Sequence, residues 1–131
     1  MTGPDDFPRA FATAFGAQDA PAIAAMMADD AEFLTLTGQY AEGRDEIAVA
    51  LGGEFAGTLR AARLVTGKLR LRALGPGASV LSQRFILTGA LDEGGQDLPR
   101  CGIVLSAVLV ATVTGWKAMT ASLSVVSDHK M

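Results

Sequence analysis

The chain has 131 residues, half of which are hydrophobic, and it carries 14 acidic against 11 basic side chains. Its net charge of −3 argues against a nucleic-acid partner, because phosphate binding needs a strongly basic surface. One cysteine excludes an intrachain disulfide, one histidine with scattered acids gives no ligand set for a metal, and the apolar run at 102–113 is well short of the ~20 residues of a spanning helix. We therefore expect one cytoplasmic domain over residues 1–131, with no cofactor, no metal, and no nucleic-acid or membrane partner.

The N-terminal segment predicts two helices. Phe7, Phe11 and Phe15 recur every four residues, which places them in one stripe along a helix. Asp19 is placed to cap a second helix, with Pro21 in the first turn, where its missing N–H costs little.

A short strand and a third helix are expected next. Residues 33–37 are β-prone and end at Gly38, and Asp29 and Asp30 are expected at the end of the preceding helix. A helix over 45–56 follows, because its apolar residues recur at four-residue spacing. The segment between the strand and this helix reads as a loop.

The second half of the chain predicts a sheet. Long β-type runs occupy residues 63–74, 79–90, 101–113 and 116–127, and the turns between them allow antiparallel hairpins. Three helices in the first half of the chain, packed against a curved antiparallel sheet, make an α+β domain.

Alternation in the last strand predicts its two faces. Trp116, Thr120 and Ser122 share one face, and Leu123 lies on the other. The strand over 101–113 is apolar on both faces, so one face needs a cover that the helices cannot supply. A second copy of the chain is the simplest cover, and we expect a homodimer through the outer face of the sheet.

The order of three segments resembles the nuclear transport factor 2-like superfamily, and within it the SnoaL-like and SgcJ/EcaC-like groups. The segments are "FATAFGAQDAPAIAAMMADDAEFLTLTG", "EGRDEI" and "GWKAMTASLS". The resemblance covers nearly the whole chain. It implies a cystatin-like cone of helices against a curved sheet, with a pocket inside the cone and dimers as the common state. It does not fix a function, because members include isomerases, hydrolases, cyclases and non-catalytic binding domains.

The catalytic positions of the resembled enzymes are occupied by other residue types here. Alignment of the motifs places the carboxylate base of ketosteroid isomerases on Thr35, their tyrosine on Phe11 and their second acid near Ser106. Threonine cannot take a proton from carbon near neutral pH. The histidines of the SgcJ/EcaC-like pattern fall on Leu51 and Ser122.

The predicted interior of the cone is apolar, with a few hydroxyl groups. This composition suits a small apolar ligand, although the same residues can instead close on one another as core. We interpret the chain as a binding domain without the usual catalytic residues; the alternative is a small enzyme of polyketide-cyclase, isomerase or hydrolase type acting on a hydrophobic molecule. The candidate pocket residues are Phe11, Phe15, Phe33, Thr35, Leu51, Phe55, Ser106, Trp116, Thr120 and Ser122.

Four polar residues outside this set could act in a site or serve only the structure. Glu54 is the best candidate acid–base group if its helix face turns inward. Arg44 is expected to pair with a neighbouring acid, such as Glu42, Asp45 or Glu46, and steady its loop. Arg84 is expected in solvent or at an interface, and His129, close to the C-terminus, is expected to be a solvated tail residue.

Overall fold

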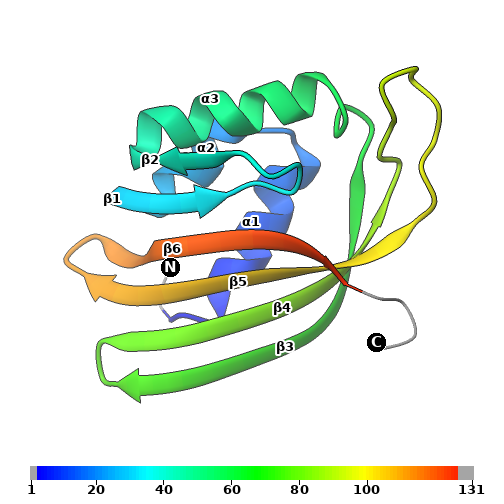
Figure 1. The fold of residues 1–131 in the computed structure, drawn as a ribbon. Helices are drawn as coiled ribbons and strands as arrows, with labels where there is room; N and C mark the ends of the chain where they lie inside the picture. Colours follow the sequence, from blue (N-terminus) through cyan, green and yellow to red (C-terminus); the bar gives the residue numbers. More distant parts are fainter. Residues whose placement is uncertain (1–2, 127–131) are drawn as a thin grey trace.

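A curved six-stranded sheet carries three helices on one of its faces (Figure 1). The structure is a computed structural model that describes residues 3–126. The strand order is β2-β1-β6-β5-β4-β3. We call the face that packs on the helices the inner face and the opposite one the outer face. None of the helices in the described part is long and apolar enough to cross a membrane.

The three predicted helices are confirmed. Helix α1 (Asp6–Gly16) buries the phenylalanine stripe, and α2 (Ala20–Ala25) begins at the predicted cap. The Asp19 carboxylate accepts a hydrogen bond from the Ala22 N–H at 3.1 Å, which satisfies one of the free donors of the first turn. Helix α3 (Gly43–Ala56) ends before Gly57 and lies across the top of the view in Figure 1.

The first strand differs from its prediction. Strand β1 (Met27–Leu34) already begins at the end of α2, so Asp29 and Asp30 lie in a strand and not at a helix end. A second short strand, β2 (Tyr40–Glu42), occupies part of the expected loop. Both differences come from tertiary pairing, because β1 is parallel to β6 and antiparallel to β2, and such pairing overrides local propensity.

The long strands agree with the predicted runs to within two residues over the described part. They are β3 (Arg63–Gly75), β4 (Ala78–Thr88), β5 (Cys101–Thr112) and β6 (Gly115–Val126). Each pairs antiparallel with the next in the chain. In Figure 1 they curve together, and α1 crosses behind them.

Aromatic side chains fill the space between α1, α3 and the sheet. The ring of Phe11 lies 6.1 Å from that of Phe15 and 6.3 Å from that of Phe85, measured between centroids. Phe15 meets Phe55 edge to face at 5.2 Å. Offset and edge-to-face pairs of this kind add to the stabilisation from burial. These side chains belong to one continuous hydrophobic core.

A bulge in β6 reverses the predicted facing of its later half. The pairing with β5 shifts register between Val108 and Leu109, so that Ala118 and Thr120 oppose consecutive residues. Before the bulge Ala118 faces inward, and after it Ala121 and Leu123 do, each at most 3 % exposed. Strict alternation could not foresee this, because one extra residue turns every following side chain to the other face.

Candidate functional site

Thr35 closes the turn between β1 and β2. Its hydroxyl oxygen accepts a hydrogen bond from the Gln39 N–H at 2.9 Å, and its own N–H donates to the Gln39 carbonyl at 2.8 Å. The Gly38 N–H donates to the Thr35 carbonyl at 3.0 Å. The side chain is only 1 % exposed. At the position where the resembled isomerases carry a base, this chain therefore has a hydroxyl that holds a turn.

Replacing Thr35 by valine is expected to lower the free energy of unfolding by about 1–2 kcal/mol, because the nearly isosteric side chain leaves the Gln39 N–H without its acceptor. Urea denaturation followed by circular dichroism measures the change. Thr35→Ser keeps the acceptor and is the matched control, with a smaller loss. A loss in Thr35→Val no larger than that in Thr35→Ser would show that the hydrogen bond to the hydroxyl does not set the effect.

Glu54 turns inward, as the enzyme hypothesis requires, and its carboxylate contacts the turn between β1 and β2. It is 3 % exposed on the face of α3 that also buries Ile47 and Leu51. Its Oε2 accepts a hydrogen bond from the Thr37 hydroxyl at 3.2 Å, and its Oε1 is buried without a partner among the described residues. The carboxylate thus ties α3 to the β1–β2 turn.

The ten predicted pocket residues divide into three sets. Six of them lie in the interior, each at most 6 % exposed, and Trp116 is half-buried against the core. Ser106, Thr120 and Ser122 were wrongly assigned to the interior: Ser106 pairs directly with Ser122 on the outer face, and Thr120 follows the bulge. The interior residues are Phe11, Phe15, Phe33, Thr35, Leu51 and Phe55.

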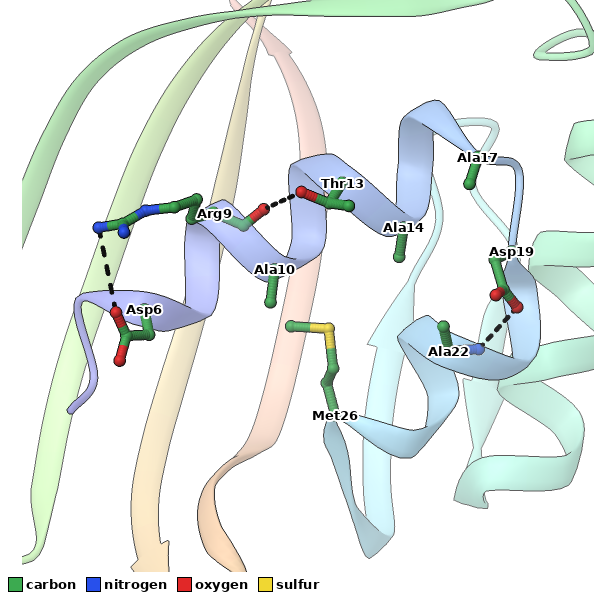
Figure 2. A pocket seen from close by; sticks show the side chains of 9 residues that line it. All are labelled: Asp6, Arg9, Ala10, Thr13, Ala14, Ala17, Asp19, Ala22 and Met26. Atoms are coloured by element: carbon green, nitrogen blue, oxygen red, sulfur yellow. Dashed lines mark hydrogen bonds and ion pairs between the residues drawn. The ribbon is translucent and has the colours of Figure 1, made fainter. Parts of the chain in front are cut away.

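A hollow of about 590 Å³ lies between α1 and α2 (Figure 2). We call it the α1–α2 hollow. Figure 2 shows the Met26 side chain extending from the end of α2 toward Ala10 of α1. Five of the nine lining residues are apolar, four alanines and Met26. The lining residues are Asp6, Arg9, Ala10, Thr13, Ala14, Ala17, Asp19, Ala22 and Met26.

The polar side chains around the α1–α2 hollow already have partners within the chain. Asp19 caps α2, as described above, and Asp6 lies 4.0 Å from Arg9 and accepts from the Gly3 N–H at 3.4 Å. The Thr13 hydroxyl donates to the Arg9 carbonyl at 3.0 Å. The hollow therefore offers an apolar wall with a charged rim. Sequence reasoning missed the hollow because the alanines of α1 do not reveal that a hollow lies beside them.

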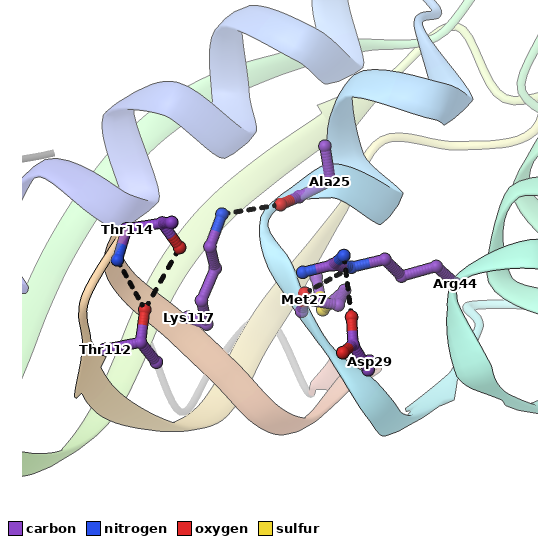
Figure 3. A network of polar contacts seen from close by, with 7 residues as sticks. All are labelled: Ala25, Met27, Asp29, Arg44, Thr112, Thr114 and Lys117. Carbon is purple, nitrogen blue, oxygen red and sulfur yellow. Dashed lines mark hydrogen bonds and ion pairs between the residues drawn. The ribbon is translucent and has the colours of Figure 1, made fainter.

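Two cations hold the junction between α2 and β1 (Figure 3). The Arg44 Nε donates to the Met27 carbonyl at 2.8 Å, and its Nη1 lies 2.8 Å from Asp29 Oδ1. The Lys117 Nζ donates to the Ala25 carbonyl at 2.9 Å. Cations suit the carbonyl end of a helix. Arg44 is thus structural, as expected, although its acid partner comes from β1 and not from its own loop.

Tyr40 and Glu32 form a polar pair on the outer face. The Tyr40 hydroxyl donates to the Glu32 carboxylate across the β1–β2 pair. This hydrogen bond, followed by desolvation and by the charges of Glu32 and Glu42, raises the pKa of Tyr40 to about 12. The phenol is held neutral because its ionised form would lose the bond and face two carboxylates.

Tyr40 is the single tyrosine, so its ionisation can be followed by phenolate absorbance. The expected midpoint is near pH 12, and Glu32→Gln is expected to return it toward 10.0. Because the folded-state pKa lies above that of the unfolded chain, the pair stabilises the fold below pH 10 and loses this effect between pH 10 and about 12. Glu46→Gln is the control; a midpoint unmoved by Glu32→Gln would refute the pairing.

Within residues 3–126 no group of three or more His, Cys, Asp or Glu side chains is arranged to hold a metal ion. His129 lies outside the described residues.

Comparison with known proteins identifies the family of this chain. A protein-family model described as "SnoaL-like domain" matches residues 6–128. A search of curated proteins finds no match.

Solved structures share the fold at low sequence identity. An uncharacterised protein with a cystatin-like fold from Caulobacter vibrioides has a TM-score of 0.85 and 18 % identity, covering 95 % of this chain and 88 % of that one. A ketosteroid isomerase-like protein from Erwinia carotovora atroseptica gives 0.77 and 19 %, covering 94 % and 93 %. An NTF2-like protein from Novosphingobium aromaticivorans gives 0.75 and 14 %, covering 94 % and 79 %. The chain belongs to the SnoaL-like domain family of the nuclear transport factor 2-like superfamily.

Proposed function

We propose that the protein binds a small apolar ligand in the α1–α2 hollow, without catalysing a reaction on it. The observation that carries this is an apolar hollow on the surface between α1 and α2, beside an interior where buried phenylalanine rings contact one another. Phenylalanine rings occupy the interior, whereas about 590 Å³ remains between the two helices, walled largely by alanine and by Met26. The hollow is an open groove whose volume lies within the range of small-molecule sites, and its alanine and methionine side chains suit an apolar ligand.

The polar groups near the hollow and the cone support binding over catalysis. A general acid or base needs a side chain free to exchange a proton with the bound molecule. Asp19 and Asp6 at the hollow hold backbone groups, and Glu54 holds Thr37. The Asp6 and Asp19 carboxylates thus have structural tasks, and Glu54 uses one of its two oxygens to hold the turn, while its Oε1 has no partner among the described residues.

Titration with N-phenyl-1-naphthylamine, a neutral dye that brightens in apolar surroundings, tests the proposal. Ala10→Leu combined with Ala22→Leu fills the hollow with helix-compatible side chains, and we expect it to weaken dye binding about tenfold or more. Ala25→Leu, at an exposed position of α2 outside the hollow, is the matched control and keeps wild-type affinity. Equal binding by the filled variant and the wild type, or no binding by the wild type, would contradict it.

A homodimer through the outer face of the sheet is the second part of the proposal. Its support is the apolar content of that face: Val80, Val104 and Val108 are half-buried within one chain, and Leu34 and Tyr40 are 40 % and 57 % exposed. A second copy would bury this surface. Light scattering at micromolar concentration is expected to give about twice 13.5 kDa; a mass of one chain would contradict it.

A further inference from the structure

The charges of the outer face lie at opposite edges of the sheet. Two rows of directly paired residues cross this face, because each member opposes the next across neighbouring strands. The first row, from β2 to β3, consists of Glu42, Glu32, Thr120, Val108, Val80 and Arg72. The next row consists of Tyr40, Leu34, Ser122, Ser106, Ser82 and Arg70. We call Glu32 and Glu42 the acidic edge, and Arg70 and Arg72 the basic edge.

Neither edge forms an ion pair with another side chain among the described residues. The ion pairs found among residues 3–126 are Arg9 with Asp6 and Arg44 with Asp29. All four side chains of the two edges belong to exposed residues.

The acidic edge carries an unfavourable contact of its own. Glu32 and Glu42 are directly opposed on neighbouring strands, and like charges in that position are destabilising. The Tyr40 hydroxyl bonds to one of them but carries no charge. An external cation at this edge would relieve the repulsion.

We propose that a second copy of this chain supplies that cation: the two outer faces stack so that the basic edge of each copy lies over the acidic edge of the other. This inference rests on the proposed homodimer and adds its orientation. A two-fold axis parallel to the strands, between the stacked faces, reverses the strand order of the partner. Strand β3 of one copy then lies over β2 of the other.

The first row fits this arrangement at its ends and the second row at its middle, whereas Arg70 lies over the Tyr40 position and Val80 over the Glu32 position. In the first row the Arg72 position stacks on the Glu42 position, at opposite ends of the same line of paired residues. In the second row the middle of the sheet brings Ser106 over the Ser122 position, and small side chains there let the faces approach. Arg84, between Ser82 and Ile86 on the same face, adds positive charge to the basic half. An axis perpendicular to the strands would instead place arginine over arginine.

Charge reversal at one edge tests the orientation, with the dimer dissociation constant measured by sedimentation at low ionic strength. Arg70→Glu with Arg72→Glu leaves two acidic edges, and we expect it to raise the dissociation constant about tenfold or more. Glu32→Lys with Glu42→Lys is expected to do the same. Arg60→Glu with Arg100→Glu makes an equal change of net charge away from both edges and keeps the wild-type constant to within about threefold.

Recombining the reversals gives the decisive comparison. A chain carrying all four reversals restores a basic edge opposite an acidic edge, and its dissociation constant is expected within about threefold of wild type. The two half-reversed proteins, mixed, are expected to form a heterodimer in preference to either homodimer. Half-reversed variants that dimerise like wild type would overturn the orientation while leaving the homodimer intact, whereas a monomeric wild type would overturn both. Circular dichroism confirms that each variant is folded.

Discussion

Replacing Phe11 by alanine is expected to lower the free energy of unfolding by about 3–5 kcal/mol. Phe11 is fully buried and joins Phe15 of its own helix to Phe85 of β4, with ring centroids 6.1 and 6.3 Å apart. Truncation removes both contacts and leaves a cavity that the surrounding sheet and helix cannot close. Urea denaturation followed by circular dichroism measures the loss.

The control for this substitution is Val49→Ala, the truncation of an apolar residue of α3 that is 77 % exposed, where a loss below about 1 kcal/mol is expected. The Phe11→Ala cavity is also expected to bind benzene, since dry apolar cavities of this kind accept such molecules. A small loss of stability, or benzene binding by the wild type inside the cone, would show that the interior is an open pocket.

Replacing Gly89 by alanine is expected to cost about 3 kcal/mol or more, from two separate causes. Gly89 follows β4 with φ of +78°, a left-handed conformation that strains other residues. An added Cβ would also lie 2.3 Å from the Ala61 carbonyl oxygen, a backbone atom that cannot rotate away. Thermal or urea unfolding measures the loss.

Gly53→Ala is the matched control. Gly53 lies inside α3, and an added Cβ there meets no atom within 4 Å. Alanine in a helix interior is favoured over glycine by about 1 kcal/mol, so this variant is expected to be more stable than wild type. Equal tolerance at both glycines would refute the close approach of the Gly89 segment to Ala61.

The sequence pattern predicted the helices and long strands because their signals are local. The four-residue spacing of Phe7, Phe11 and Phe15 and the cap at Asp19 need no information from the rest of the chain. Strand β1 lacked such a signal. Its first half contains two aspartates, which are rare in strands, and it forms because β6 and β2 supply pairing on its two sides.

The candidate site was harder to predict for three physical reasons. The bulge in β6 reversed the facing of Thr120 and Ser122. The alternation of residue types along the sequence does not show where one extra residue enters a strand. Whether aromatic residues leave a cavity or close on one another depends on packing in three dimensions. The α1–α2 hollow depends on the angle between two helices, which the alanines of α1 do not reveal.

Arg44 illustrates the same limit at a single side chain. The sequence offered Glu42, Asp45 and Glu46 as its partners, all within two positions. The structure pairs it with Asp29 instead, because the end of α2 brings Met27 and Asp29 beside the start of α3. Partners that are distant in the chain become neighbours only through the fold.

Two adjacent methionines report separately on the hollow and on the cone. Met26 lines the α1–α2 hollow, whereas Met27 is fully buried in the core. With ¹³C-methyl methionine in the wild-type protein, titration with N-phenyl-1-naphthylamine is expected to shift the Met26 methyl resonance and leave that of Met27 in place. A shift of Met27 with Met26 unmoved would place the ligand inside the cone and contradict the proposed site.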